Sequence, residues 1–307
     1  MVQNNLNIKF ALLVPCYNAA AYIDPFLDNL SKLDTSFDEI IFYDDASTDN
    51  TYQLLLAKGN IVIRGAENKG PGYARNRLAE AASSPYIHFH DIDDEFNPRF
   101  LSLVNQKLEG YAYDVMLGYA DWIDKTSREV LIKWRYSEQG IVNDPVNYFV
   151  SNPLGIINTV YRRSFFLQEK GFNEGIKCWE DADLHIRLAA AGARFAVIDE
   201  VLAYSIRHNN GISRNQQWCW QCRLKFMQLY LEKYRGVIDR DVFKAELKRI
   251  QTVFINMGLY DRLKQIIDLN KRYSLGIPTQ KTAIIYYLNK IVPTPILQST
   301  LQYFNGK

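Results

Sequence analysis

Short apolar runs alternate with helix-like patterns along the first 90 residues of the chain. In the helix-like segments apolar residues recur every three or four positions, whereas the short runs are apolar nearly throughout, as in buried strands. This alternation predicts an α/β fold whose mostly parallel central sheet is flanked by helices on both faces. The predicted strands are 8–14, 39–43, 61–64 and 86–89, and the predicted helices are 22–33, 51–57 and 73–82.

The pattern changes after residue 94. From 216 to about 269 helical patterns dominate, and Ile284, Leu288 and Ile291 form a further apolar stripe on a helix. We therefore predict an α/β domain over 1–214 and a helical C-terminal extension over 215–307. Within the first of these, the later strands are predicted at 114–119, 130–134, 156–161 and 195–198, and the later helices at 98–108 and 180–191.

The charge of the chain is distributed unevenly between these two parts. Residues 1–214 hold 21 Lys+Arg against 28 Asp+Glu, a balance of −7, and residues 215–307 hold 15 against 6, a balance of +9, which together give the net +2. A basic extension with aromatic residues indicates an anionic partner, either lipid head groups or nucleic acid. The alternative is the ordinary solvated face of a helical subdomain.

Composition excludes several classes of protein. A hydrophobic fraction of 48% with 23% charged residues is incompatible with intrinsic disorder. Four scattered cysteines do not form a disulfide framework, and Cys219 and Cys222 lack the second pair that a zinc site needs. The first residues do not resemble a signal peptide, and no apolar run has the length of a membrane span. We therefore expect a cytoplasmic protein.

Polar residues follow the first two predicted strands. Ligands of parallel sheets bind outside the carboxyl ends of the strands, so these residues are candidates for a binding site. Pro15 fixes the exit of the first strand, and Tyr17 is an aromatic ring that can stack on a base. Asp44 and Asp45 end the second strand, where two adjacent carboxylates repel each other unless hydrogen-bond donors lie opposite. A base N–H or ribose hydroxyls are such donors.

The segment 67–76 has the composition of an anion or nucleotide cradle. A turn with Asn68 and Gly70 opens a helix, and Arg75 follows one turn into it. Arg75 stands where the third glycine of the dinucleotide-binding fingerprint belongs, which disfavours a Rossmann dehydrogenase. The alternative is a plain helix start with a surface arginine.

Four carboxylates follow the strand 86–89 within five residues, namely Asp91, Asp93, Asp94 and Glu95. A hard divalent cation, Mn²⁺ or Mg²⁺, held by one or two of these carboxylates and by phosphate oxygens compensates their charge. If the strand continues, its period of two places Asp91 and Asp93 on the same side. We expect His88 and His90, which alternate with apolar residues, to be core histidines.

Trp179, Glu180 and Asp181 stand at the start of the helix 180–191. A helix N-terminus favours carboxylates electrostatically, so a capping role explains part of this cluster. A carboxylate held beside an aromatic ring also suits a general base. In the loop further along, His208 is within reach of a metal or a diphosphate, or is an ordinary exposed side chain.

Taken together, these motifs resemble the inverting glycosyltransferase family 2 of bacterial polysaccharide type, which has the GT-A fold. The resemblance covers about the first 215 residues and rests on five segments in the family's order and spacing. They are VPCYN at 14–18, YDDASTDNT at 43–51, ENKGPGYARN at 67–76, HDIDDE at 90–95 and WEDADLHIRL at 179–188.

The resemblance implies a nucleotide-diphospho-sugar donor, with UDP as the expected nucleotide. It assigns donor binding to about 1–95 and the acceptor side to about 96–214. For the nucleotide, the resemblance implies that Tyr17 stacks on the base, Asp45 recognises it and Arg75 supports it. Asp91 and Asp93 correspond to a metal-binding D-x-D motif, with Asp93 as the direct ligand. Asp181, beside Glu180, corresponds to the general base, and His208 to a residue that contacts the metal or the diphosphate.

The acceptor is expected to be a saccharide or a lipid-linked saccharide, and no nucleic acid partner is expected. The extension is expected to attach peripherally to the inner face of the cell membrane, and the alternative is that its apolar stripe packs on the catalytic domain or on a second subunit. A homo-oligomer is left open. The Gln-x-x-Arg-Trp motif of processive synthases is missing, so repeated chain extension through a membrane channel is not expected. Alternatives are a sugar-phosphate nucleotidyltransferase, which needs a glycine-rich basic loop where this chain has 17–21, and a non-catalytic sugar-nucleotide-binding module, which does not need Asp181 or the D-x-D motif.

Overall fold

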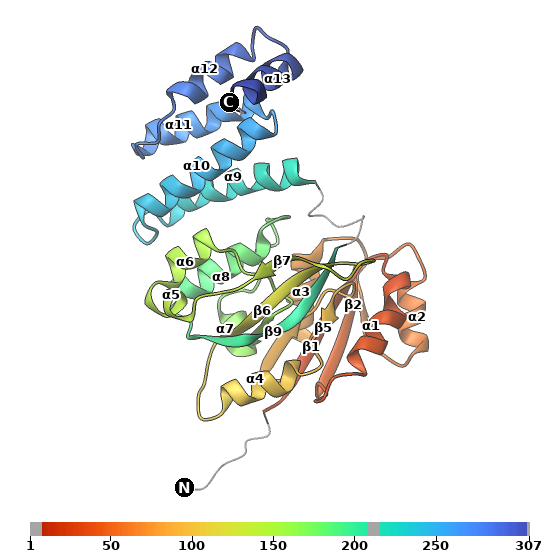
Figure 1. Ribbon diagram of the computed structural model, residues 1–307. Coiled ribbons are helices and arrows are strands. Elements are labelled where there is room, and N and C mark those ends of the chain that lie inside the picture. The colour runs from red at the N-terminus through yellow and green to blue at the C-terminus, as the bar shows by residue number, and fades with distance from the viewer. Residues whose placement is uncertain (1–7, 208–214, 306–307) are drawn as a thin grey trace. The chain divides into compact units, whose positions relative to one another are not determined.

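The structure is a computed structural model that describes residues 8–207 and 215–305 (Figure 1). The chain divides into two compact units, residues 1–211 and 212–307. The sequence pattern places the boundary close by, after residue 214. Each unit is described by itself below.

The first unit begins with four parallel strands in the order β3-β2-β1-β4. They are buried or partly buried runs joined by helices, as the sequence pattern predicts. The core beside β1 contains many aromatic rings, among them Phe10, Phe26, Phe42, Phe96 and Phe100. The strands are β1 (Phe10–Cys16), β2 (Glu39–Asp44), β3 (Ile61–Arg64) and β4 (Tyr86–Phe89), and the connecting helices are η1 (Ala20–Tyr22), α1 (Ile23–Leu30), α2 (Thr51–Ala57) and α3 (Pro71–Ala81).

The second half of the sheet is mixed, which corrects the prediction of a mostly parallel sheet. Of the eight strand pairings among the described residues, four are parallel and four antiparallel. β6 and β7 are antiparallel because a short turn joins them, and such a turn cannot join parallel strands. The strands here are β5 (Glu95–Phe96), β6 (Val115–Asp124), β7 (Val130–Trp134), β8 (Thr159–Arg162) and β9 (Phe195–Arg207).

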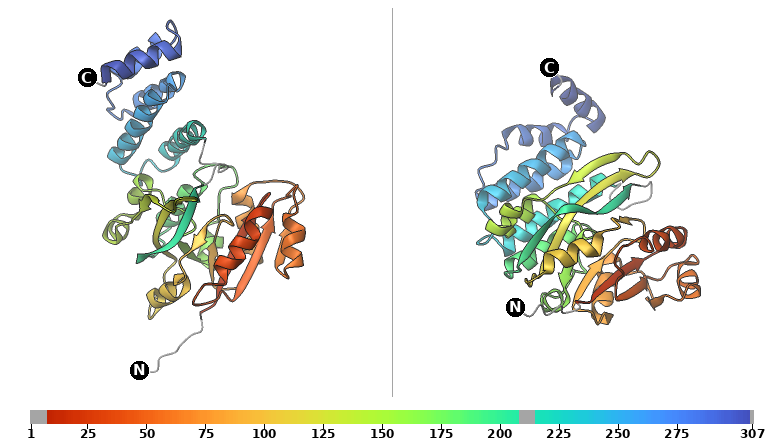
Figure 2. Two further views of the ribbon diagram at one scale, coloured as in Figure 1. Left: turned by 45° about the vertical axis from the view of Figure 1, so that its right-hand side comes forward. Right: turned by 60° about the horizontal axis from the view of Figure 1, so that its bottom comes forward.

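Helices flank this sheet, so the predicted α/β class is confirmed. The strands form one twisted sheet with helices along it (Figures 1 and 2). The sequence did not predict β5 or α5 to α7, and it underestimated the length of β9. The helices are α4 (Phe100–Leu108), α5 (Glu138–Asn143), α6 (Pro145–Ser151), α7 (Arg163–Gln168) and α8 (Glu180–Ala190).

The two histidines of β4 are core residues, as the sequence predicts. His88 and His90 are fully buried. His88 Nδ1 lies 2.9 Å from the carbonyl oxygen of Thr159 and must donate to it, so His88 Nε2 accepts from His90 Nδ1 at 3.0 Å. Burial lowers the pKa of His88 to about 3 and that of His90 well below its usual value. A third buried histidine, His185, lies 2.7 Å from the hydroxyl of Tyr161.

His185 makes the free energy of unfolding depend on pH. Burial lowers its pKa to about 3 in the folded protein, against ~6.5 in the unfolded chain. The unfolded chain therefore binds more protons below pH ~6.5, and stability is lost as pH falls from there toward 3. Between pH 7.5 and 5 we expect the wild type to lose about 2 kcal/mol more than His185→Gln in urea unfolding. Parallel pH dependences of the two proteins would contradict this.

The second unit is a stack of helices in sequence order, in which α9 packs on α10, α10 on α11 and α11 on α12 (Figure 1). A buried ion pair of 2.9 Å between Arg223 and Glu246 joins the first two. Among the described residues, the helices are all too short or too polar to cross a membrane. They are α9 (Gln216–Lys233), α10 (Arg240–Asn256), η3 (Tyr260–Arg262), α11 (Leu263–Tyr273), α12 (Gln280–Leu288) and α13 (Thr294–Asn305).

Candidate active site

Carboxylates gather where β2, β1 and β4 end. These strands are neighbours in the sheet, and Cys16 at the end of β1 lies opposite Asp44 at the end of β2. Burial raises the pKa of the Cys16 thiol well above its usual value, and four nearby carboxylates raise it further. They are Asp44, Asp91, Asp93 and Asp49. Acidic side chains from the end of β2 and from the loops after β2 and β4 therefore meet around the end of β1.

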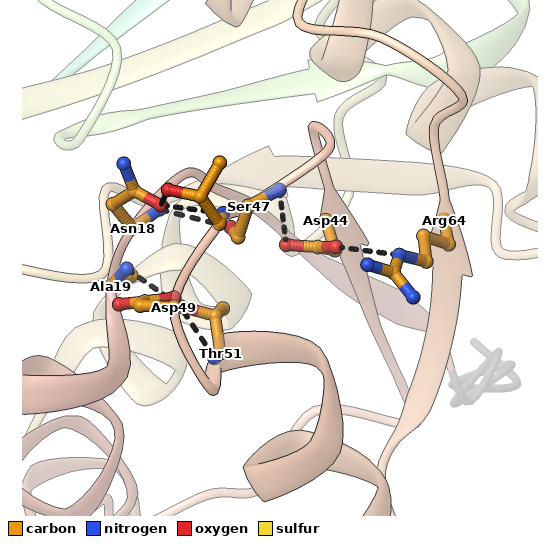
Figure 3. Close-up of polar contacts among 8 residues, drawn as sticks. Asn18, Ala19, Asp44, Ser47, Asp49, Thr51 and Arg64 are labelled. Atoms are coloured by element: carbon orange, nitrogen blue, oxygen red, sulfur yellow. Dashed lines mark hydrogen bonds and ion pairs between the residues drawn. The ribbon is translucent and has the colours of Figure 1, made fainter.

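Hydrogen bonds hold the loops after β1 and β2 together (Figure 3). The backbone N–H of Asn18 donates to Ser47 Oγ at 2.9 Å, and the N–H of Thr48 donates to Asn18 Oδ1 at 2.9 Å. The N–H of Ala19 donates to Thr51 Oγ1 at 2.7 Å. Asn18 has a φ of 49°, a left-handed conformation that asparagine tolerates better than most residues. The two loops thus form one connected rim.

Tyr17 lies on this rim, two residues after Pro15. Pro15 is part of β1, and the Tyr17 side chain is 51% exposed. The Tyr17 ring is not packed in the core, so its face is open to stacking on a base. The stacking of Tyr17 on a base stays a prediction.

Asp44 is fully buried and has partners within the protein (Figure 3). Its Oδ1 accepts from the N–H of Ser47 at 3.3 Å, and its Oδ2 lies 3.3 Å from Arg64 Nε. The protein thus supplies donors for this carboxylate, so the repulsion between Asp44 and Asp45 does not by itself require a nucleotide. Arg64 was not singled out from the sequence, although its place at the end of a predicted strand marks the same edge of the sheet.

Asp45 holds the loop that leads into α3. Its two carboxylate oxygens accept from the N–H groups of Lys69 at 3.0 Å and Gly70 at 2.7 Å. Gly70 has a φ of 91°, which side chains other than glycine's rarely permit, and this conformation directs its N–H to Asp45. Asn68 is exposed on the same loop. The cradle is therefore tied to β2, and contact of these residues with a nucleotide stays a prediction.

Arg75 is the central cation of the site. It is buried, and its Nη2 donates to Asp91 Oδ1 at 2.8 Å while its Nη1 donates to Glu180 Oε1 at 3.0 Å. Burial opposes the charge of the guanidinium, but the two carboxylates outweigh it and raise the pKa of Arg75. The plain surface arginine is thereby excluded. Arg75 joins the loop after β4 to the start of α8, two segments about 90 residues apart in the sequence.

The segment after β4 turns immediately, so the condition of a continued strand, on which the period-of-two argument depended, is not met. β4 ends at Phe89, and the N–H of Asp94 donates to the carbonyl oxygen of Asp91 at 3.0 Å, closing a turn. Asp91 and Asp93 are nevertheless both partly exposed, with Ile92 and Asp94 buried. The turn, and not a continued strand, therefore exposes Asp91 and Asp93 and buries Ile92 and Asp94.

At least three of the four carboxylates in this segment have partners within the protein, since Asp91 pairs with Arg75 and both Asp94 and Glu95 are also bonded. Asp94 Oδ1 accepts from the N–H of Ile206 at 2.8 Å, and burial together with the charges of Asp93 and Asp91 raises the pKa of Asp94, which favours its neutral form. Glu95 pairs with Arg128 at 2.6 Å. A metal ion therefore has less charge to compensate than the count of four carboxylates implies.

Asp181 has a pKa well above that of an ordinary aspartate. It is partly buried, and burial followed by the charge of Glu180 raises its pKa to about 7, against the opposing effects of the Ala182 N–H and Arg75. At neutral pH a carboxyl of this pKa exists in both protonation states, which suits proton transfer in either direction. The charge of Glu180 thus raises the pKa of Asp181, and the charge of Arg75 lowers it.

The start of α8 is strained at Trp179. This residue caps the helix with a φ of 71°, a left-handed conformation that is rare for a bulky side chain, and such strain is concentrated at functional sites. Asp183, in contrast, is structural. It pairs with Arg187 at 2.7 Å, and Arg187 also donates to the carbonyl oxygen of Gly171 at 2.6 Å.

The oxygen-rich edge fits a hard divalent cation. Among the described residues, no group of three His, Cys, Asp or Glu side chains could hold a metal alone. Mg²⁺ and Mn²⁺ need fewer, because phosphate oxygens and water complete their shell. Asp91 and Asp93 are the two partly exposed aspartates of this segment, and Asp91 Oδ1 already accepts from Arg75. His208, the third predicted ligand, lies outside the described residues.

Lys177 is a residue that sequence reasoning missed. Its Nζ donates to the carbonyl oxygen of Lys69 at 2.7 Å, so the segment before α8 is fastened to the cradle. A lone lysine in a loop gives no signal in the sequence, because only the fold brings it near the loop before α3.

The family model described as glycosyl transferase family 2 matches residues 11–176, more than half of the chain. This segment contains the carboxylates after β2 and β4 and the cradle with Arg75. It ends just before Glu180 and Asp181.

Two relatives of known function are similar in sequence. The processive diacylglycerol beta-glycosyltransferase of Mycoplasma pneumoniae is 28% identical over 181 residues, which cover 52% of this chain and 53% of the relative. The poly(ribitol-phosphate) beta-N-acetylglucosaminyltransferase TarS of Staphylococcus aureus is 27% identical over 213 residues, which cover 66% of this chain and 36% of TarS. The chain therefore spans about half the length of the first relative and little more than a third of the second.

A solved structure is similar over nearly the whole chain. The crystal structure of S. aureus TarS residues 1–349 in complex with UDP-GlcNAc superposes with a TM-score of 0.67 at 20% sequence identity, covering 98% of this chain and 93% of that one. At this identity the likeness bears on the fold. It confirms the predicted GT-A fold with a helical C-terminal region.

Proposed function

Since the chain belongs to glycosyltransferase family 2, we propose that it transfers a sugar from a nucleotide-diphospho-sugar to an acceptor hydroxyl, with inversion at the anomeric carbon. The observation that carries the proposal is the bridge through Arg75, which ties Asp91 at the acidic edge to Glu180 beside Asp181. A donor held at that edge lies close to a carboxyl group of pKa about 7. The carboxyl group proposed for proton transfer thus lies close to the edge proposed to hold the sugar donor.

Asp181 acts as the general base in this proposal. Its carboxylate form accepts the proton of the acceptor hydroxyl as that oxygen attacks the anomeric carbon, and the bond to the nucleoside diphosphate breaks on the opposite face. One such displacement inverts the configuration. Burial and then the charge of Glu180 keep the pKa of Asp181 high, and Arg75 holds Glu180 in position.

Donor binding is assigned to the rim and the cradle. Tyr17 stacks on the base, Asp45 and Gly70 shape the loop that receives the nucleotide, and Arg75 supports the diphosphate side. Asp93 and Asp91 hold Mn²⁺ or Mg²⁺ with the diphosphate oxygens. When bound, the metal supplies positive charge that stabilises the departing nucleoside diphosphate.

The proposed donor is a UDP-sugar, and the proposed setting is bacterial glycolipid or surface polysaccharide synthesis. The TarS crystal structure contains UDP-GlcNAc, and the two relatives are named for transfer to diacylglycerol and to poly(ribitol-phosphate). A saccharide or a lipid-linked saccharide is accordingly the proposed acceptor. Family membership disfavours the nucleotidyltransferase, and Asp181 with its raised pKa disfavours the non-catalytic module.

A panel of nucleotide sugars tests the donor. A ligand that binds only the folded state raises the melting temperature, so the chain is heated with UDP-, GDP- and dTDP-sugars, each with and without Mn²⁺. We expect UDP-sugars to raise the melting temperature only when Mn²⁺ is present. Indifference to every nucleotide sugar would overturn the proposal, and stabilisation without metal would overturn its metal dependence.

Glu180→Gln is expected to shift the pH dependence of turnover. In the wild type, the rate of donor hydrolysis, with water as acceptor, rises with pH through about 7 as Asp181 loses its proton. Loss of the Glu180 charge lowers the pKa of Asp181, so the rising limb moves to lower pH. Glu174→Gln, which changes a more distant carboxylate, is the matched control and leaves the limb in place. An unmoved limb in Glu180→Gln would contradict this electrostatic role.

A further inference from the structure

The helices α12 and α13 carry an apolar surface that the described residues leave uncovered. Ile284, Tyr287, Leu288 and Ile291 recur every three or four positions and so share one side of α12 and the turn after it. Ile296 follows at the start of α13. These five side chains, called the α12–α13 apolar face below, are between 40% and 81% exposed.

The opposite side of α12 is already used for packing. Ile285 and Thr282 are buried within the second unit, where α12 packs on α11. Within the second unit, α12 therefore packs through one side and exposes apolar side chains on another. Contiguous exposed apolar patches mark surfaces that bind a protein or a membrane.

The segment that carries the α12–α13 apolar face has a positive net charge. Residues 269–307 contain no Asp or Glu and five basic residues. Lys281 stands three positions before Ile284 and so lies on the same side of α12. Lys290 is next to Ile291 and is exposed, although it also pairs with Asp261 at 2.8 Å. The basic residues are Lys271, Arg272, Lys281, Lys290 and Lys307.

We propose that the α12–α13 apolar face docks on the surface of a membrane that contains anionic lipids. An interfacial helix inserts its apolar side chains at the boundary between head groups and acyl chains, and basic residues beside it meet the negative head groups. Tyr287 suits this boundary because its ring is apolar and its hydroxyl is polar. Apolar insertion and positive charge are also the two signals that stable attachment needs together.

Charge favours this partner over a second copy of the chain. A symmetric dimer formed through this face would bring the same patch of each copy together. The basic residues of one copy would then face those of the other, with no acidic residue in the segment to offset them. An anionic lipid surface supplies the missing negative charge. It also brings the protein to the place where a lipid-linked acceptor, which belongs to the proposed function, is found.

Co-sedimentation of the full chain with vesicles tests the proposal. Vesicles of phosphatidylcholine alone are compared with vesicles that also contain phosphatidylglycerol, and we expect binding to the anionic vesicles only. Ile284→Ser with Ile291→Ser should weaken binding at least about tenfold, because two inserted side chains are lost. Lys281→Glu should weaken it about fivefold or more, because a charge near the surface contributes about that factor. Val237→Ser, an exposed apolar residue between α9 and α10, is the matched control and should bind as the wild type.

Three outcomes would overturn the proposal. They are equal behaviour toward both vesicle types, wild-type binding by the Ile284 and Ile291 double variant, and a wild-type dimer in sedimentation that the double variant converts to a monomer. The last outcome would assign the face to a second copy. Hydrolysis of a soluble donor is measured in parallel and should be unchanged in every variant, so that loss of membrane binding is distinguished from loss of the fold and from failure of the proposed activity.

Discussion

Replacing Asp181 by asparagine is expected to lower the rate of sugar transfer by ~10² to 10⁴, the usual contribution of a general base. The amide keeps nearly the shape of the carboxyl group but cannot accept the proton of the attacking hydroxyl. Donor affinity should be retained, because the rim, the cradle and the carboxylates after β4 are unchanged. Single-turnover rates and donor titrations measured on the same preparation separate the two effects.

Glu180→Gln is the matched control for this experiment. It removes the neighbouring carboxylate of the same helix turn and leaves Asp181 in place, so turnover should persist with a displaced pH dependence. If Asp181→Asn kept near-normal turnover while Glu180→Gln lost it, the base would be Glu180. The motif would then be misassigned by one position.

Asp93→Ala is expected to abolish the metal-dependent part of nucleotide binding. Its side chain is partly exposed at the acidic edge, and the proposed cation would lose much of its affinity with one of its two proposed protein ligands removed. Calorimetric titration with UDP in the presence and absence of Mn²⁺ measures the effect. We expect Mn²⁺ to increase UDP affinity in the wild type and to have no effect in the variant.

Asp28→Ala is the control for Asp93→Ala. Asp28 is an exposed aspartate on α1 whose only described ion pair is with Lys32 on the surface. This variant should keep the full effect of Mn²⁺ on UDP binding. Undiminished metal-dependent affinity in Asp93→Ala would remove Asp93 from the metal site.

The sequence predicted the first half of the fold well because its signals there are local. Strands such as 61–64 and 86–89 are apolar runs with turns on either side, and the structure has β3 and β4 at these residues. The second half depends on pairing between distant segments. β8 inserts antiparallel between β4 and β6, and no pattern within 156–161 indicates its direction. The mixed sheet was therefore missed.

The sequence predicted many of the candidate residues of the site but not which of them contact one another. Carboxylates at strand ends and a helix start with Arg75 are visible in the sequence. That Arg75 would bind both Asp91 and Glu180, or that Asp45 would bind the N–H groups of the cradle, depends on three-dimensional proximity. The turn at Asp91–Asp94 shows a further limit. A strand and a turn would both expose Asp91 and Asp93 and bury the residues that alternate with them, so the polarity of these residues does not distinguish the two.

The most direct measurement of the central claim is the anomeric configuration of the first product. The UDP-sugar that stabilises the chain most is incubated with it and Mn²⁺, and the sugar released by transfer to water is followed by proton NMR before it mutarotates. A single displacement assisted by Asp181 predicts that an α-linked donor first gives the β-anomer, and that Asp181→Asn gives almost none. Release of the α-anomer, or equal rates in the two proteins, would contradict the account.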